Sequence, residues 1–324
     1  MLWIVACVAL LSGVEAESEK AVPANTVIVA VGEPGEPQYE QMFAEWAARW
    51  REATAKSDSK CVEIGLTPRE ADSKADRDIL QATLAELAKD PPQTLWIVLI
   101  GHGTFDGKKA KFNLRGADIT AADLAERLAP LSCRVAIVNC ASASGPFLQQ
   151  LTGENRAVIT STQSGFEHNF ARFGGYLSKA IGDAAGDLDK DGQTSLLEAW
   201  LAAAKQTQEY YDSDSRLATE HSLLDDNGDG KGTPADWFRG IHIIKTSKDA
   251  ALPDGTLANQ FILTPSDAKS ALPEELRQQR DELERKLAEL RQQKETLAEE
   301  EYLQQLEAIL IPLAKLYQSA EAKD

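Results

Sequence analysis

The sequence has little positive charge, few cysteines and no long apolar run beyond its first residues, and each shortage argues against a class of protein. It has 34 lysines and arginines against 51 aspartates and glutamates, a formal net charge of −17. Nucleic-acid-binding proteins neutralise phosphates with basic side chains, so we expect no nucleic acid as a partner. Four cysteines in 324 residues are too few for a disulfide-stapled scaffold. No later stretch approaches the roughly 18 apolar residues that a membrane span needs.

The first residues are typical of a secretory signal peptide. An apolar run over residues 2–11 is followed by small residues and a cleavage-like site at residues 14–16. No Lys or Arg precedes the run, and a lipidation site at Cys7 is the alternative interpretation. We expect residues 1–16 to be removed and the mature chain to be secreted or periplasmic.

Loss of Cys7 would leave an odd number of cysteines, so at least one thiol is unpaired or bonded to another molecule. Cys61 and Cys133 each lie close to the start of an expected strand. Two interpretations stay open for them, a disulfide bridge or two small buried hydrophobic side chains.

From residue 26 onward, short apolar runs alternate with helical patterns. The sequence predicts strands at residues 26–31, 61–64, 95–100, 134–138 and 156–160. It predicts helices around Phe43, Trp46 and Trp50, over residues 78–89, after a cap formed by Thr120 and Asp123, and over residues 170–181. Strands separated by helices pair in parallel through right-handed crossovers. We therefore predict an α/β fold, a three-layer α/β/α sandwich with a mostly parallel sheet, whose sites lie at the carboxyl ends of its strands.

Two of the predicted strands run directly into reactive residues. His102 and Gly103 follow the strand at 95–100, and Cys140 follows the strand at 134–138. We expect the sulfur and the imidazole to meet at one edge of the sheet. Thiol attack on an amide also needs two donors for the oxyanion, and the backbone N–H groups of Gly103 and Cys140 are the candidates. The alternative is that Cys140 is a packed small hydrophobic residue.

These motifs resemble those of the caspase-like cysteine peptidases, most closely the legumain branch and its bacterial relatives. The resemblance covers about residues 26–182 and rests on His102-Gly103, on Cys140 at a strand end, on the Ser-x-Ser-Gly that follows it, and on Gly174-Gly175. It implies a Cys–His dyad that hydrolyses peptide bonds through a thioester acyl-enzyme. Cys140 would be the nucleophile, and His102 would protonate the leaving amine.

The resemblance also concerns substrate recognition. Members of the similar family build part of the primary specificity pocket from the loop after the fifth strand. In this chain that loop offers Ser161 and Gln163. Asn139 stands before the nucleophile, where the family commonly has alanine preceded by an acidic residue. The implied partner is a peptide or protein substrate, with no residue that fixes the preferred side chain.

A twelve-residue acidic segment over 187–198 matches the EF-hand calcium loop at each key position. The candidate ligands are Asp187, Asp189, Asp191, Gln193 through its carbonyl, Ser195 and Glu198. Gly192 takes the sharp turn. Oxygen atoms crowded in this way repel one another unless a cation lies between them, and the alternative is an acidic solvated turn.

A second segment, over 225–236, keeps most of this pattern. Its candidate ligands are Asp225, Asn227, Asp229, Lys231 through its carbonyl, and Asp236. Asp236 is shorter than the usual glutamate, Asp226 competes with Asp225 for the first position, and a glycine-rich turn is the alternative. Calcium is therefore the expected cofactor, in a structural role.

The expected domain order follows from these segments. A peptidase-like core over 17–185 precedes a calcium-binding region over 186–245, a connector over 246–271 and a coiled-coil-like tail over 272–324. The tail repeats leucine every seven residues, at Leu276, Leu283, Leu290 and Leu297. We predict one long helix, kinked or ended by Pro312, whose partner is the body of the chain or a second copy through residues 272–317.

Three functions are compatible with the sequence. The first is an exported, calcium-binding cysteine endopeptidase. The second is a non-catalytic, calcium-stabilised interaction module that uses the tail as its docking arm. In the third, the tail covers the peptidase cleft as a zymogen segment.

Overall fold

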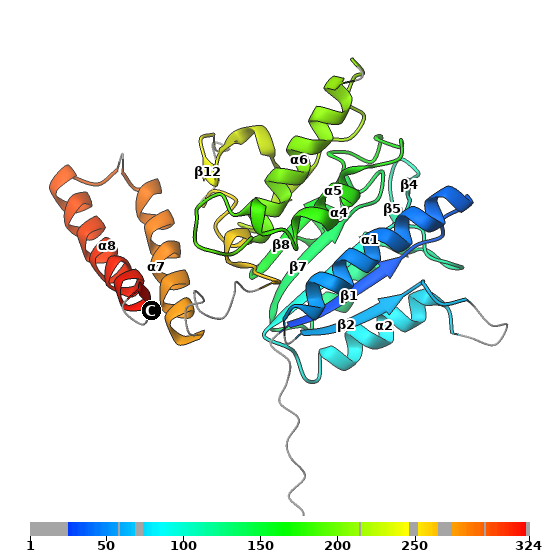
Figure 1. Cartoon of the computed structure of the whole chain (residues 1–324), viewed down its shortest axis with the longest axis horizontal. Coiled ribbons are helices and arrows are strands. Elements are labelled where there is room, and N and C mark those ends of the chain that lie inside the picture. Colours follow the sequence, from blue (N-terminus) through cyan, green and yellow to red (C-terminus); the bar gives the residue numbers. More distant parts are fainter. Residues whose placement is uncertain are drawn as a thin grey trace, which may run out of the picture.

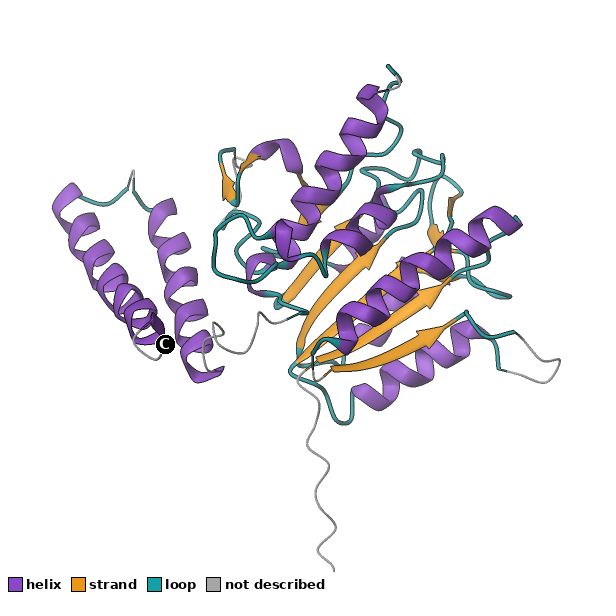
Figure 2. Cartoon of the chain, viewed as in Figure 1, coloured by secondary structure: helices purple, strands orange, loops and turns teal. Residues whose placement is uncertain are grey.

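A computed structural model of the chain describes residues 25–57, 59–68, 74–213, 215–245, 252–264, 274–294 and 296–321. The predicted signal peptide lies outside these residues. Within them, the central sheet has seven strands in the order β10-β9-β8-β7-β3-β1-β2 (Figure 1). Helices cover both of its faces (Figure 2).

Five parallel strands form the greater part of this sheet. They are β1 (Asn25–Val31), β2 (Ser59–Ile64), β3 (Thr94–Ile100), β7 (Arg134–Asn139) and β8 (Arg156–Thr160). Two short antiparallel strands, β9 (Leu223–Asp225) and β10 (Thr233–Pro234), extend it at one edge. The apolar runs of β1 and β3 are buried because helices lie on both faces. The predicted, mostly parallel sheet is confirmed.

The helices divide between the two faces. The first face carries α1 (Pro37–Ala55), α5 (Phe173–Ala180) and α6 (Leu196–Ser213). The other carries α2 (Asp76–Leu87), α3 (Ala121–Leu128) and α4 (Gly145–Leu151). Trp50 and Trp200 are buried on the first face, and Leu84 and Leu124 on the other. The predicted three-layer sandwich is therefore confirmed.

Short elements connect these layers. A three-stranded sheet of β4 (Gly103–Phe105), β5 (Ala110–Phe112) and β6 (Ile119–Thr120) directly follows β3. A further hairpin pairs β11 (Phe238–Arg239) with β12 (His242–Ile243). The 3-10 segments are η1 (Ala184–Gly186), η2 (Ala235–Trp237) and η3 (Ala258–Gln260). The predicted cap of α3 is present, because Thr120 Oγ1 accepts the N–H of Asp123 at 3.1 Å and the Asp123 carboxylate accepts the N–H of Thr120 at 3.1 Å.

The described segments between α6 and residue 264 include parts of the same core and sheet. Helix α6 packs in the core of the first face, and β9 and β10 join the central sheet. Residues 252–264 fall within the expected connector, yet Phe261 and Leu263 are buried in this core. Phe261 packs edge-on against Trp96 of β3, with ring centroids 5.6 Å apart. This stretch is thus an integral part of the sandwich.

The tail forms two helices rather than the predicted single one. α7 (Glu274–Gln292) and α8 (Glu299–Glu321) lie side by side as a hairpin (Figure 1). Leu287, Leu290 and Leu316 are buried. Of the kink or stop expected at Pro312, the stop is wrong, since α8 continues through this residue. No helix of the described residues is both long and apolar enough to cross a bilayer.

Candidate functional sites

His102 and Cys140 leave neighbouring strands at the same edge of the sheet. β3 and β7 pair in parallel with Leu99 opposite Asn139. Cys140 comes directly after β7, and His102 lies two residues beyond the end of β3. The sequence-based expectation of a shared edge therefore agrees with the observed strand pairing.

The Cys140 side chain is packed into the core. It is 1% exposed, and a Cβ added at Gly174 of α5 would lie 2.9 Å from its sulfur and 2.8 Å from the Trp46 ring. Burial, followed by the charge of the Glu220 carboxylate, raises the pKa of the Cys140 thiol to about 12. The thiol is therefore protonated at neutral pH, whereas nucleophilic cysteines have lowered pKa values.

The His102 imidazole lies half-buried among aromatic rings. Its centroid is 4.8 Å from that of Tyr39, 5.2 Å from that of Phe43 and 6.0 Å from that of Phe170. Nε2 is 3.2 Å from the carbonyl oxygen of Pro34, which can only accept, so Nε2 carries a hydrogen. Burial lowers the pKa of the imidazole, while the Pro34 carbonyl raises it in part. In the neutral ring, Nδ1 is left as the acceptor.

The two side chains share an aromatic cluster without being bonded to each other. Trp46 meets the Cys140 side chain over Gly174, and its ring packs against Phe43 and Phe170, which flank His102. No hydrogen bond within the described residues joins the imidazole to the Cys140 sulfur. This conformation places the dyad residues in one cluster but leaves them without a proton-transfer path.

The two candidate oxyanion donors also have other partners. The Cys140 N–H donates to the carbonyl of Leu99 at 2.9 Å. The Gly103 N–H lies 3.4 Å from Ser142 Oγ, which in turn donates to the Gly103 carbonyl at 3.3 Å. Neither N–H group is free in this conformation to hold a tetrahedral intermediate, which needs donors aimed at the developing oxyanion.

The two predicted substrate-binding residues differ in their access to solvent. Ser161 is fully buried, and its hydroxyl donates to the carbonyl of Ala141 at 2.5 Å. Gln163 lines a cavity of about 910 Å³, together with Phe105 and Phe166 among others. Only Gln163 is therefore placed to touch a ligand, and Ser161 supports the loop from within.

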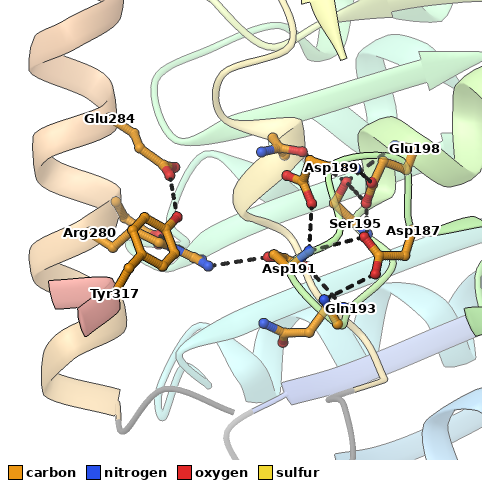
Figure 3. Close-up of polar contacts among 12 residues, drawn as sticks. Asp187, Asp189, Asp191, Gln193, Ser195, Glu198, Arg280, Glu284 and Tyr317 are labelled. Atoms are coloured by element: carbon orange, nitrogen blue, oxygen red, sulfur yellow. Dashed lines mark hydrogen bonds and ion pairs between the residues drawn. The ribbon is translucent and has the colours of Figure 1, made fainter. Parts of the chain in front are cut away.

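The first acidic loop brings its three aspartates together (Figure 3). Carboxylate oxygens of Asp187, Asp189 and Asp191 all lie within 4.8 Å of one another. Burial, followed by the charge of Asp189, raises the pKa of Asp191 to about 6. Three oxygen-bearing side chains without any His or Cys are the donor set that calcium prefers. The residues present thus fit the expected cation.

Glu198 closes this loop from the first turn of α6 (Leu196–Ser213). Its carboxylate accepts the N–H groups of Leu188 at 2.6 Å and Asp189 at 3.3 Å, and both the N–H and the hydroxyl of Ser195 at 2.8 Å. The Ser195 hydroxyl in turn accepts the Glu198 N–H at 3.2 Å, which makes the pair a capping box. Gln193 lies buried, and its side-chain amide points away from the aspartates (Figure 3).

The tail contacts the first loop through a buried arginine, which sequence reasoning missed because the heptad pattern marks only its leucines. The guanidinium of Arg280 in α7 lies 3.4 Å from Asp191 and 3.0 Å from Asp281 (Figure 3). Asp281 also lies 3.7 Å from Arg134, the first residue of β7. The tail therefore docks at the amino end of the parallel strands, whereas His102 and Cys140 lie at the carboxyl end. This geometry argues against a tail that covers the cleft.

The second acidic loop has Asp225 at its first position, as expected, and differs from expectation at its last. Asp225 is 1% exposed, and its Oδ1 accepts the N–H of Gly228 at 3.0 Å. Asp226, the competing candidate, turns away and accepts the N–H groups of Gly255 and Ala258. The Asp236 side chain is 73% exposed and lies 3.6 Å from Lys245, so it is not placed as the twelfth ligand.

Two buried carboxylates that accept backbone N–H groups could not be recognised from the sequence. Glu220 accepts the N–H groups of Arg172 and Phe173 at the start of α5, at 2.8 and 3.0 Å. Asp254 accepts N–H groups of the second loop. Both lie in segments without a recognisable motif. Cys61, Cys133 and Cys140 carry free thiols, so the bridge considered for the first two is not formed.

Comparison with known proteins gives likeness of structure alone. The sequence matches no family model and no curated protein. Similar solved structures include the Drosophila initiator caspase Dronc, at 11% identity and a TM-score of 0.43, over 73% of this chain and 96% of that one. They also include Chaetomium thermophilum Raptor (12% identity, TM-score 0.34, 49% of this chain and 18% of that one). Protein GSU0716 from Geobacter sulfurreducens gives 12% identity and a TM-score of 0.39, over 62% of this chain and 92% of that one.

Proposed function

We propose that the chain is a calcium-stabilised interaction module built on a cysteine-peptidase-type α/β core. The burial of Cys140 carries this proposal. Its side chain is 1% exposed, its thiol pKa is raised to about 12, and its backbone N–H is bonded to Leu99. Peptide hydrolysis would need a thiolate open to substrate and two free oxyanion donors.

The tail is the proposed docking arm. On α8, Leu303, Leu310 and Ile311 are 54%, 42% and 45% exposed, and Tyr317 is 39% exposed. Leu303 and Leu310 are seven residues apart, the spacing that keeps one helix face against a like helix, whereas the Tyr317 hydroxyl donates to Glu284 at 3.3 Å and so lies against α7. We take the partner to be a second copy of the chain. Sedimentation analysis should show a dimer that Leu310→Glu dissociates and Glu301→Gln, on another face of α8, leaves intact, whereas a monomeric parent chain would contradict this.

Calcium would be held by the oxygen atoms of the two acidic loops. In the first loop these are the side chains of Asp187, Asp189 and Asp191, with Glu198 closing the loop from α6. A bound cation would neutralise the mutual repulsion of these carboxylates and fix the start of α6. The chain is proposed to be exported, because calcium is abundant outside cells and fills sites with dissociation constants of about 10⁻⁴–10⁻³ M.

A cysteine endopeptidase is the second candidate, favoured by the meeting of His102 and Cys140 at one sheet edge. It would require Trp46 and α5 to move apart and expose the sulfur. Cys140 Sγ would then attack the peptide carbonyl and form a thioester. The neutral His102 ring would shuttle the thiol proton to the departing amine, and water would hydrolyse the thioester.

One experiment decides between the two. The purified mature chain is incubated with a diverse peptide library and with a thiol-directed acyl-mimicking probe, with calcium and with EDTA. We expect neither turnover nor labelling at Cys140 in either condition. Labelling that requires calcium and disappears in both Cys140→Ala and His102→Ala would establish the peptidase instead, with Cys133→Ala as the matched control.

A further inference from the structure

The two acidic loops share the same turn features between positions three and seven. Positions four and six take positive φ angles in both, at +66° and +85° in the first loop and +80° and +71° in the second, for Lys190, Gly192, Gly228 and Gly230. In both, the side chain at position three accepts the N–H of position five. Its oxygen is 3.1 Å away for Asp189 and 2.9 Å away for Asn227.

The same agreement extends one step further along the loops. The side chain at position five accepts the N–H of position seven, at 2.9 Å for Asp191 and 2.7 Å for Asp229. The second segment therefore has the turn pattern of the first loop. The first and second loops can be compared position by position.

The loops diverge after position nine. The first continues into α6, which carries Glu198 back over the loop. In the second, Pro234 follows position nine, and the chain forms β10 and η2 instead of a helix. Asp236 is thereby carried to the surface, beside Lys245. The second loop thus lacks a closing carboxylate from its own segment.

A carboxylate from another segment, Asp254, makes the contacts in the second loop that Glu198 makes in the first. In the first loop, the carboxylate of Glu198 accepts the N–H groups of positions two and three and the hydroxyl of position nine. In the second loop, the carboxylate of Asp254 accepts the N–H of Asp226 at 2.9 Å, the N–H of Asn227 at 3.2 Å and the hydroxyl of Thr233. These are positions two, three and nine of that loop. Asp254 is 4% exposed.

We propose that Asp254 is the closing carboxylate of the second calcium loop, where it joins Asp225, Asn227 and Asp229 in place of Asp236. An unpartnered oxygen supports a cation here. Oδ2 of Asp225 is buried and receives no hydrogen bond of ordinary geometry, although the Thr152 hydroxyl lies near this carboxylate, while Oδ1 accepts an N–H of the loop. A buried carboxylate oxygen without a partner is costly unless a cation compensates it.

The second site is thus assembled from two segments of the chain. Residues 225–233 supply the loop, and Asp254 comes from the stretch that places Phe261 in the core. A cation there would fasten the loop to the sandwich through that stretch. This inference rests on the calcium binding proposed above.

Calorimetric titration of the EDTA-stripped full chain with calcium tests the assignment. The parent chain should bind two ions, and Asp254→Asn should weaken one of them at least tenfold. Asp236→Asn should leave both unchanged, and Glu198→Gln should weaken the other ion. Unchanged binding in Asp254→Asn, or loss of a site in Asp236→Asn, would overturn the inference while calcium binding stands. A parent chain that binds no calcium would overturn the proposed function, and the inference with it.

Thermal unfolding separates a ligand from a structural carboxylate. If Asp254 is a calcium ligand, the substitution Asp254→Asn should reduce the rise in Tm that calcium produces. As a purely structural residue it would lower Tm equally in calcium and in EDTA, which would contradict the proposal. Should Asp254→Asn fail to fold, Asp236→Asn still decides, since a lost site there returns the role to Asp236.

Discussion

Gly174 sets how closely α5 approaches Cys140. An added Cβ would lie 2.5 Å from the Cys140 Cβ and 2.8 Å from Trp46, distances that only movement of the helix can relieve. Gly174→Ala gains up to about 1 kcal/mol of helix propensity, but overpacking costs about 1–3 kcal/mol, so we expect a net loss of stability. Chemical denaturation measures it. Gly153→Ala, whose Cβ would meet only the Arg156 side chain at 3.4 Å or more, is the control and should change stability by less than about 0.5 kcal/mol.

The raised pKa of Cys140 predicts both reactivity and pH dependence. At pH 8 the native thiol should resist iodoacetamide, as followed by mass spectrometry of the Cys140 peptide, and should react once the chain is unfolded. The thiol pKa rises from 9.0 to about 12 on folding, so within this window the folded chain holds one proton more than the unfolded chain. Stability should therefore fall as pH rises through it, by up to about 1.4 kcal/mol per pH unit. Rapid native labelling of Cys140 would contradict this.

Residue identity and order were predictable, but residue environment was not. The alternation of apolar runs placed Cys140 and His102 at neighbouring strand ends because strand periodicity is a local property. Whether the sulfur faces a cleft or Trp46 depends on how α1 and α5 pack over it, which no local pattern encodes. Asp254 escaped prediction for the same reason, since its contacts lie 21 to 28 residues away in the chain.

At the scale of elements, a buried ion pair anchors α2. Arg115 donates to both carboxylate oxygens of Asp76, at 2.7 and 3.0 Å, and the Asp76 side chain is 2% exposed. Arg115→Leu would leave that carboxylate buried and unpaired, and we expect a loss of about 3 kcal/mol in the free energy of unfolding. Lys89→Ala is the matched control, because the Lys89–Glu86 pair is 70% and 72% exposed and should contribute less than about 1 kcal/mol. Equal effects of the two substitutions would count against the anchoring role.

Elements defined by their own residues were predictable from the sequence, whereas elements defined by a distant partner were not. The capping box of α3 and the strand at 156–160 were predicted within their own residues. The single tail helix was wrong, because a heptad pattern reports an apolar seam without saying whether the partner is another chain or the same chain folded back. The antiparallel strands β9 and β10 have two or three residues each and carry too few side chains to show a period.

For the whole molecule, bound calcium should act as a ligand of the folded state alone. At a concentration of one hundred times its dissociation constant, each ion adds about 2.7 kcal/mol to the free energy of unfolding. Tm should therefore rise with calcium and fall with EDTA, as differential scanning calorimetry would show. Magnesium is the control, since it requires a tighter octahedral site and should stabilise less. A Tm that is independent of calcium would contradict the proposal that calcium binds the folded chain.

Phe261 moves the end of the α/β core further along the sequence than expected. Its ring fills a gap between Trp96 and the Arg134 guanidinium, which lies 4.8 Å above it, so the sandwich is completed only by residues far downstream of its last strand. A shortened chain that stops at the end of β12 would lose this plug and leave an indole of the central sheet open to water. One that stops after Thr264 would keep it and shed only the helical hairpin.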